Sequence, residues 1–385
     1  MRVVIATRIF APEVSAASAI HRRWAEEFRD RGAQVSVVTT RPPAGSVVDD
    51  PPGVDVRRAR VVRDRQQYVR GYLSYLSFDI PLFFRLLFSR RPDLYVVEPP
   101  PTSVAVVRLV AGLRRVPYVV RAADYWSDAA ELVTGNRMVL GALRAVEAWG
   151  LRGARLLFAA HEPLIGRLRE AGITTPAIPI GLGADTNDFR YDGSLPADPP
   201  VFVYAGTHSE WHGAGIFVEA MKDVVAAHPG ARLLFYGNGE EREAMQAKAA
   251  ELGVAESVDF HEPIPPAELS PIFASATASL ASLAPVPRNE YVVATKMYSS
   301  LAAGCPVIFV GGGPTATLVM YAEHPEIGLV VDYDPRAVAA AMSTVADDPL
   351  LPPKRADLSE WSSRTYSLDA IAHEVVDASL GVIRA

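Results

Sequence analysis

Cysteine is nearly absent from this sequence, and long apolar runs are missing altogether. Cys305 is the one cysteine in 385 residues, which excludes an internal disulfide framework and a cysteine-based metal site. It precedes Pro306-Val307-Ile308 in an apolar run, which indicates a buried structural thiol rather than a nucleophile. No run of about 18 uncharged apolar residues occurs, so we expect no membrane-spanning helix. Residues 1–6 lack the features of a secretory signal and predict a strand, and we expect a cytoplasmic protein.

Charge is unevenly distributed along the chain. The net charge is −6, but residues 1–190 hold 27 basic and 19 acidic residues, whereas the remainder holds 11 and 25. A basic half joined to an acidic half indicates two units with different partners. The basic excess is modest and no recognition motif accompanies it, so we expect no nucleic-acid partner. Much of the excess lies in Arg57, Arg58, Arg60, Arg63, Arg65 and Arg70. These arginines form either a solvated surface or one that attracts anionic lipid headgroups or a phosphorylated acceptor.

Short β-branched runs alternate with longer amphipathic segments in both halves, the pattern of an α/β protein with parallel sheets. In the first half we predict strands at 3–6, 34–39, 94–97, 118–121 and 156–159, with a helix at 18–31 that Gly32 ends. In the second half we predict strands at 201–204, 232–236, 258–261, 278–283 and 307–310, with helices at 216–227 and 240–252.

The segment 191–200 is rich in Gly, Pro and Asp and predicts a linker. We therefore place an N-terminal domain at 1–195 and a C-terminal domain at 196–365. We expect a helix within 366–385 that packs back on the first domain. Residues 72–91 are rich in Leu, Phe and Tyr, but Asp79, Pro81 and Arg85 interrupt them. This segment is either a core-facing helix pair or a membrane-surface helix with Arg90 and Arg91 near phosphates.

Three loops of the second half carry the chemistry, because ligands of such sheets bind outside the carboxyl ends of strands. The loop 205–213 contains Gly206, Thr207 and His212. It is either a phosphate-binding loop or a plain strand-to-helix turn. The second loop, Gly237-Asn238-Gly239-Glu240, is a common kind of turn. In the third, Thr295 is expected to cap a helix running to Ala303. Arg288 and Lys296 add cations there, which predicts a diphosphate site.

In order along the chain, these motifs resemble the donor domain of GT-B glycosyltransferases. The resemblance rests on the loop near 206, the Gly-Asn-Gly turn, Phe260-His261-Glu262-Pro263, and the stretch from Lys296 to Ile308. The first half agrees through Phe10-Ala11-Pro12-Glu13, Asp124-Tyr125-Trp126 and the stretch 183–189. The sequence is similar to the retaining glycosyltransferase family 4, in particular to its branch in bacterial surface-polysaccharide and related glycan assembly. The resemblance covers nearly the whole chain and implies two Rossmann-like, doubly wound domains facing a central cleft.

The family implies retaining transfer from a nucleoside-diphosphate sugar as co-substrate, with no metal and no resident cofactor. Lys296 matches the lysine that heads the motif helix, and His212 stands where the family has a phosphate-binding lysine. Asp124 matches an acidic position near the reacting sugar. As a hypothesis it orients the acceptor hydroxyl or takes up its proton; alternatively, it caps the following helix. Ser15 and Ala16 occupy a loop where many members have glycines beside the diphosphate.

Two positions depart from the family pattern. Ser299 stands where a glutamate grips the ribose hydroxyls, and its partner position falls at Tyr291, one residue from Glu290. Histidine at 212 is only partly protonated near neutral pH, so the positive charge there is weakened. Two alternatives therefore stay open: a weakened GT-B protein that serves as scaffold partner of an active transferase, and a transferase with an unusual donor in natural-product assembly.

The predicted site has a catalytic, a donor and an acceptor part. His161 either lines the cleft or caps a turn, and Glu98 either contacts the acceptor or lies in a rigid loop. The acceptor is a glycan, a lipid-linked glycan or a small molecule, with at most peripheral contact to the inner membrane face. The candidates are Asp124 for catalysis; Gly206, Thr207, His212, Gly237, Asn238, Arg288, Asn289, Glu290, Lys296 and Ser299 for the donor; and Ser15, Ala16, Glu98, Arg121 and His161 for the acceptor.

Overall fold

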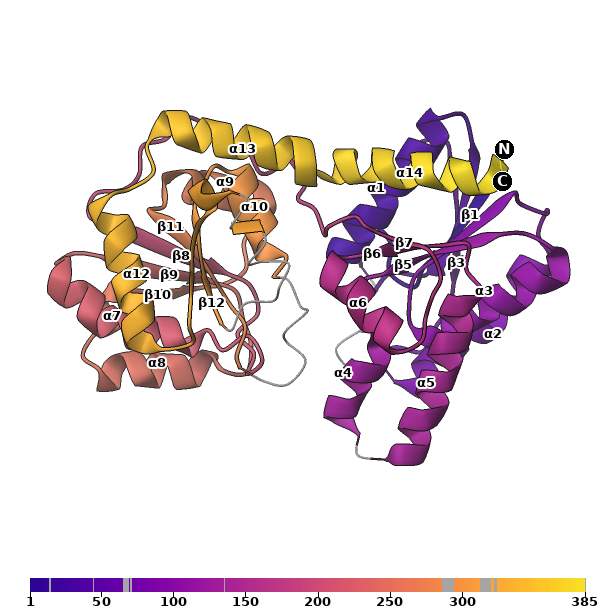
Figure 1. The fold of residues 1–385 in the computed structure, drawn as a ribbon, viewed down its shortest axis with the longest axis horizontal. Helices are drawn as coiled ribbons and strands as arrows, with labels where there is room; N and C mark the ends of the chain where they lie inside the picture. The colour runs from indigo at the N-terminus through magenta and orange to yellow at the C-terminus, as the bar shows by residue number, and fades with distance from the viewer. Residues whose placement is uncertain are drawn as a thin grey trace. The chain divides into compact units, whose positions relative to one another are not determined.

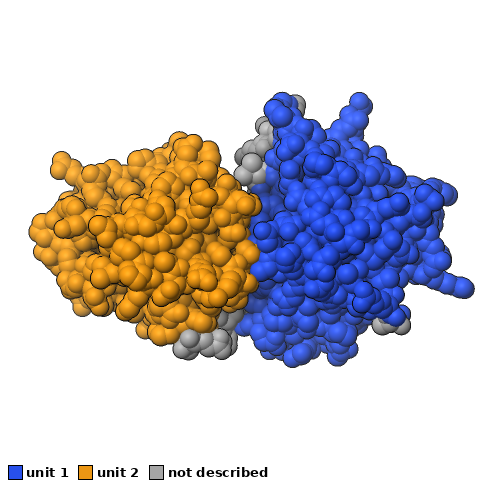
Figure 2. Space-filling model, turned by 90° about the horizontal axis from the view of Figure 1, so that it is seen from above, with its two compact units in different colours: residues 1–182, 368–385 blue, residues 183–367 orange. Residues whose placement is uncertain are grey.

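The protein consists of two compact α/β units. The computed structural model describes residues 1–13, 15–43, 45–64, 69, 71–134, 136–285, 294–311, 320–321 and 324–384. Unit 1 comprises residues 1–182 and 368–385, and unit 2 comprises residues 183–367 (Figures 1 and 2). Across the described ranges, no helix is long and apolar enough to cross a bilayer.

Unit 1 is built on a seven-stranded parallel sheet of order β3-β2-β1-β4-β5-β6-β7. The order runs outward in both directions from β1, as in doubly wound nucleotide-binding folds. The strands are β1 Arg2–Ala6, β2 Gln34–Thr40, β3 Val54–Ala59, β4 Leu94–Val97, β5 Tyr118–Ala122, β6 Leu156–Ala159 and β7 Ala177–Pro179. The helices are α1 Ala16–Asp30, α2 Tyr72–Phe88, α3 Pro101–Arg114, α4 Trp126–Val133, α5 Arg137–Arg152, α6 Glu162–Glu170 and α14 Leu368–Arg384.

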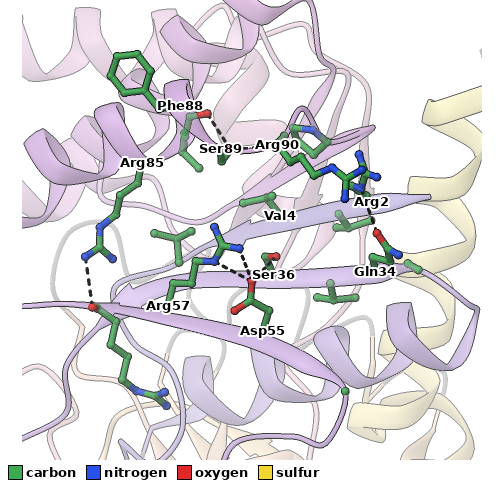
Figure 3. Close-up of a pocket in the computed structure, with 18 residues that line it drawn as sticks. Arg2, Val4, Gln34, Ser36, Asp55, Arg57, Arg85, Phe88, Ser89 and Arg90 are labelled. Carbon is green, nitrogen blue, oxygen red and sulfur yellow. Dashed lines mark hydrogen bonds and ion pairs between the residues drawn. The ribbon is translucent and has the colours of Figure 1, made fainter.

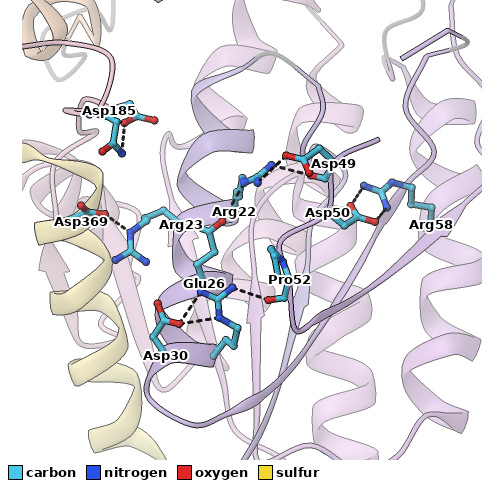
Figure 4. Close-up of polar contacts among 12 residues, drawn as sticks. Arg22, Arg23, Glu26, Asp30, Asp49, Asp50, Pro52, Arg58, Asp185 and Asp369 are labelled. Atoms are coloured by element: carbon cyan, nitrogen blue, oxygen red, sulfur yellow. Dashed lines mark hydrogen bonds and ion pairs between the residues drawn. The ribbon is translucent and has the colours of Figure 1, made fainter. Parts of the chain in front are cut away.

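The last helix of the chain packs in the core of unit 1. Ile371 and Val375 of α14 are buried in the same apolar cluster as Trp24 and Phe28 of α1. Each pair is spaced four residues apart, so its members lie on one helix face. Ion pairs flank this contact: Arg23 pairs with Asp369, and Arg31 Nη1 lies 2.8 Å from Asp377 Oδ1. Figure 4 shows the first of these pairs, together with the pairs Arg22–Asp49 and Arg58–Asp50 that tie down the segment before β3.

Unit 2 has a six-stranded parallel sheet of order β10-β9-β8-β11-β12-β13, again wound outward from its first strand. The strands are β8 Val201–Ala205, β9 Arg232–Tyr236, β10 Val258–His261, β11 Ala278–Ser282, β12 Val307–Val310 and β13 Gly328–Val331. The helices are α7 Gly215–Ala227, α8 Arg242–Glu251, α9 Pro266–Ser275, α10 Lys296–Ala302, α12 Pro335–Asp347 and α13 Pro352–Tyr366, with short 3₁₀ turns η1 Ala255–Ser257 and η3 Pro325–Ile327.

The units divide between Leu182 and Gly183, and not near 195 as the sequence predicted. The segment after Gly183 bonds to unit 2: Ala184 N donates to Tyr366 O (2.9 Å), and Arg190 N to Ser270 Oγ (3.1 Å). Gly, Pro and Asp residues indicate where helices and strands end. A domain boundary instead lies where the chain stops making contacts with one unit and starts making them with the other. The second boundary, predicted at 365, lies between Ser367 and Leu368.

Residues 72–88 form one helix rather than a pair. α2 is continuous over its 17 residues although Pro81 lies inside it. It packs on α3, and its side chains Phe78, Leu82 and Leu86 are buried.

Candidate functional site

The carboxyl edge of the unit 2 sheet holds a lysine anchored on a buried tyrosine. Tyr204, near the end of β8, is fully buried. Lys296, the first residue of α10, donates a 2.6 Å hydrogen bond from Nζ to Tyr204 Oη and lies 3.9 Å from the centre of that ring. Tyr204 Oη in turn donates to Thr207 O at 3.0 Å. Burial lowers the pKa of Lys296 to about 7, so the charged and neutral forms of its amine are both present near neutral pH.

Two glycines let the loops after β8 and β9 touch through their backbones. A Cβ on Gly237, whose φ is 149°, would lie 2.0 Å from Gly206 O. Gly206 itself has φ 154°, and a Cβ there would lie 3.1 Å from Lys296 Nζ. His208 N donates to Asn238 O (3.0 Å), which continues the strand pairing into the loops. The structure therefore brings Gly206, Thr207, Gly237, Asn238 and Lys296 together at one edge.

His212 belongs to this loop but carries no charge at neutral pH. Its Nδ1 lies 2.7 Å from Ser209 Oγ, and its ring stacks on Trp211 with centroids 3.9 Å apart. Burial, together with the nearby Lys296 charge, lowers the pKa of His212 to about 3. The expectation of a partly protonated His212 is therefore wrong, because a buried ring beside a cation loses the favourable hydration of its charged form.

His208 is a buried histidine that the sequence interpretation missed. Its side chain has no exposed surface, and neither ring nitrogen has a hydrogen-bond partner. The rings of Tyr204, Phe235 and Phe260 lie 6.0, 5.5 and 6.3 Å from it, centre to centre. Burial lowers its pKa to about 4, helped by Arg242 and Lys296. A lone histidine in a glycine loop gives no sequence signal that separates this position from a surface turn.

The helix start at Lys296 differs from the prediction. Thr295 has helical backbone angles and its side chain makes no capping hydrogen bond; α10 is seven residues long, and Ser299 is partly buried on it. Asn238 Oδ1 accepts from Gly239 N at 2.8 Å. The predicted donor residues Arg288, Asn289 and Glu290 lie outside the described residues. Within the described ranges, no group of three or more His, Cys, Asp or Glu side chains could hold a metal ion.

The carboxyl edge of the unit 1 sheet holds a buried carboxylate with three partners. Glu98 follows β4, and its Oε1 accepts from Thr7 Oγ1 at 2.5 Å. Its Oε2 lies 3.4 Å from Arg121 Nη1 and 3.5 Å from His21 Nε2. Burial lowers the pKa of His21, which leaves Arg121 as the cation of the cluster. The structure thus joins the predicted Glu98 and Arg121, and adds Thr7 and His21, which the sequence analysis missed.

A second buried group lies beside this cluster, around Arg8. The Arg8 guanidinium lies 4.2 Å from the centre of the Tyr75 ring, and its charge influences both Asp79 and Glu98. Asp79 accepts from Ser103 Oγ at 2.5 Å, and burial raises the pKa of this carboxyl. Within the part of the chain that the structure describes, this arginine faces an aromatic ring and forms no close salt bridge.

Three other predicted residues of unit 1 stand at helix starts. Ser15 caps α1 by accepting from Ser18 N at 3.1 Å, and Ala16 is the first residue of that helix. His161 caps α6 through Nδ1, which accepts from Leu164 N at 3.2 Å; burial lowers its pKa to about 4. Of the two readings of His161, the structure therefore places it in the turn-capping role.

Asp124 is exposed after β5 and does not cap α4. Its alternative role as a helix cap is wrong, because Glu147 from α5 takes that role. The Glu147 carboxylate accepts from Trp126 N and Ser127 N, each at 2.8 Å. The Asp124 side chain is thus left for other contacts.

Unit 1 also has a pocket of about 730 Å³ at the opposite, amino end of β1 and β2. Five arginines line it, and Figure 3 labels four of them, Arg2, Arg57, Arg85 and Arg90, around the groove between the sheet and the end of α2. Arg57 pairs with Asp55 at 2.6 Å, and Arg2 Nε donates to Gln34 Oε1 at 3.1 Å. The other three are Arg58, Arg85 and Arg90.

Family models match both units. Residues 16–182 match a "Glycosyl transferase 4-like domain", and residues 199–348 match "Glycosyl transferases group 1". Unit 1 is therefore similar to the glycosyl transferase 4-like domain, and unit 2 to the group 1 glycosyl transferases. The chain is 30% identical over 207 residues to a D-inositol 3-phosphate glycosyltransferase of Acidothermus cellulolyticus. The match covers 49% of the chain and 42% of that relative, so the chain spans less than half the length of this relative.

Solved structures show the fold of the chain. Sucrose-phosphate synthase from Thermosynechococcus elongatus superposes with a TM-score of 0.74 at 16% identity, covering 100% of this chain and 99% of that one. Anabaena Alr3699/HepE in complex with UDP superposes with a TM-score of 0.71 at 14% identity, covering 99% and 100%. The architecture is therefore GT-B, with two Rossmann-like α/β domains.

Proposed function

We propose that this protein is a glycosyltransferase that moves a sugar from a nucleoside-diphosphate sugar to a hydroxyl acceptor, with retention at the anomeric carbon and without a metal ion. The observation that carries the proposal is the Lys296 ammonium, anchored on Tyr204 beside the touching Gly206 and Gly237 loops. A cation beside glycine loops at the carboxyl edge of a parallel sheet suits a diphosphate. The UDP complex of the structural neighbour supports this class of donor.

In this proposal Lys296 neutralises the charge that develops on the leaving diphosphate, the task that a metal ion performs in other transferases. An approaching diphosphate stabilises the ammonium form and so raises the pKa of Lys296 from about 7. His212 takes part as a hydrogen-bonding group that is neutral in the free protein, where burial lowers its pKa to about 3.

On the acceptor side, Asp124 orients the hydroxyl or takes up its proton. It is an exposed carboxylate directly after a strand end, and Glu147 relieves it of helix capping. Glu98 and Arg121 support this edge from within the unit. The acceptor is a glycan, a lipid-linked glycan or a small molecule, and the protein acts in the cytoplasm.

A ligand screen tests the donor. The purified protein is mixed with UDP, GDP, ADP, TDP and their sugar conjugates in the presence of EDTA, and its melting temperature is recorded. Ligand at about 100 times its Kd should stabilise the fold by roughly 2.7 kcal/mol. We expect one nucleotide to raise the melting temperature, and Lys296→Ala to abolish the shift. Lys222→Ala, at an exposed position of α7, is the matched control and should bind like the wild type.

Ser299 keeps a second candidate function open, because a serine cannot replace the bidentate grip of a glutamate on ribose hydroxyls. No shift with any nucleotide at millimolar concentration would favour a scaffold partner of an active transferase. A shift only with an uncommon sugar conjugate would favour natural-product assembly. Product analysis by NMR then reports the anomeric configuration, and an inverted product would contradict the proposal.

A further inference from the structure

The outer layer of unit 1, formed by α2, α3 and α5, combines apolar and cationic side chains. α2 packs on α3, and α3 packs on α5. Of the large apolar side chains exposed in the described ranges, most lie on these helices: Leu73, Leu76, Ile80, Phe84, Phe88, Leu109, Leu113, Met138, Val139, Val146 and Trp149. Such a concentration is unusual for a surface in contact with water alone.

The apolar side chains of α2 form a stripe along one face. Leu73, Leu76, Ile80, Phe84 and Phe88 follow at spacings of three and four residues, which places them side by side on a helix. Leu73 is 77% and Phe88 79% exposed. Because the opposite face of α2 is buried, the helix is apolar on both sides. The stripe spans the 17-residue helix, or roughly 25 Å.

The exposed charges on α2, α3 and α5 are all positive. The helices α2, α3 and α5 contain only two acidic residues, Asp79 and Glu147, and both are buried. Their arginines are Arg85, Arg108, Arg114, Arg137, Arg144 and Arg152, and Arg90 and Arg91 follow α2 directly. The arginine-lined pocket opens at the end of the stripe, since Arg85, Phe88 and Arg90 are among its lining residues (Figure 3).

We propose that the layer of α2, α3 and α5 is a docking surface for an anionic lipid bilayer. The stripe enters the boundary between headgroups and acyl chains, and the arginines around it contact lipid phosphates. A second copy of the chain fits this surface less well, because a symmetric pair would bring the arginines of these helices face to face. The inference is independent of the donor and the reaction.

Vesicle sedimentation tests the surface with the full-length protein. We expect binding to phosphatidylcholine vesicles that contain phosphatidylglycerol, weaker binding to pure phosphatidylcholine, and loss of binding with added salt. The variant Ile80→Ser/Phe84→Ser/Phe88→Ser should bind at least roughly 100-fold more weakly. The variant Arg85→Gln/Arg90→Gln/Arg137→Gln should lose affinity on the order of 100-fold.

The matched control is Val47→Ser/Leu195→Ser/Leu351→Ser, which removes three exposed apolar side chains elsewhere and should bind like the wild type. All variants change exposed positions and should keep the melting temperature. As a direct probe, Phe84→Cys carries an environment-sensitive fluorophore, because Cys305 is buried. We expect a blue shift with anionic vesicles, which the same label at Leu351→Cys lacks. The proposal is overturned if the wild type ignores anionic vesicles, if the stripe variant binds equally well, or if the stripe proves to be a dimer contact.

Discussion

Lys296 Nζ lies 2.6 Å from Tyr204 Oη and 3.9 Å from the centre of the same ring, so one buried tyrosine holds the ammonium through both its hydroxyl and its π face. Both contacts favour the charged form, yet burial outweighs them and lowers the pKa of Lys296 to about 7. A lysine in this state responds to the charge of its ligand and to pH.

Donor affinity should fall as pH rises through neutrality. Below about pH 7 Lys296 already carries its proton, whereas above it binding of an anion requires proton uptake. The Kd for the nucleotide should therefore rise by up to about tenfold per pH unit above 7, as measured by calorimetry between about pH 6 and pH 9. Lys296→Arg, always protonated, should remove this dependence. A flat wild-type profile would show that Lys296 stays charged throughout.

His212→Lys should tighten donor binding. The native ring is neutral because its pKa is about 3, so lysine adds a charge that can pair with the diphosphate. We expect roughly a tenfold lower Kd, the size of one charge-assisted hydrogen bond, in a nucleotide titration. His212→Gln, which keeps a neutral polar group, is the control and should bind like the wild type. Weaker binding by the lysine variant would mean that the Trp211 stack and the Ser209 contact position the ring.

Gly237→Ala should disrupt the donor edge. The added Cβ would meet Gly206 O at 2.0 Å, and φ is 149°, so the two loops must separate. We expect a loss of at least about 2 kcal/mol in chemical denaturation and loss of nucleotide binding. Gly253→Ala is the control for backbone strain alone, because φ at Gly253 is 74° but nothing lies within 4 Å of a Cβ there. It should lower the free energy of unfolding by about 1 kcal/mol and leave nucleotide binding intact. Equal behaviour of the two variants would contradict the close approach.

Glu98→Ala should destabilise unit 1. It removes the carboxylate that Thr7, Arg121 and His21 share and leaves a buried guanidinium without its partner. Breaking a buried pair in this way costs about 3–5 kcal/mol, measurable as an earlier unfolding transition in denaturant. Glu98→Gln keeps an acceptor for Thr7 and should lose less. A loss below about 0.5 kcal/mol for the alanine variant would show that water takes over the role of the carboxylate.

The sequence predicted most of the sheet because the central strands are continuous apolar runs. Three of these strands have the bounds that the sequence predicted: Leu94–Val97, Leu156–Ala159 and Val307–Val310. β3 was missed, because Val54–Ala59 alternates apolar and charged residues at the sheet edge. A half-exposed edge strand lacks the composition that signals a buried one.

The glycine loops and Lys296 could be found in the sequence, since each follows a strand end. The groups that surround them could not. Glu147 caps α4 from a different helix, and His21 reaches Glu98 from α1. The burial that sets the pKa of Lys296 and His212 depends on side chains distant in sequence, such as Tyr204 for Lys296. The spacing of residues along the sequence predicts none of these contacts.

The packing of α14 on α1 has a consequence for biosynthesis. Trp24 and Phe28 are translated before unit 2, but the helix that covers them, with Ile371 and Val375, is translated after it. Throughout synthesis of unit 2 the first unit therefore carries an uncovered apolar groove, which nascent-chain chaperones recognise. Synthesis of unit 1 therefore begins before unit 2 and ends after it, and a premature stop codon before residue 368 would leave the core of unit 1 open.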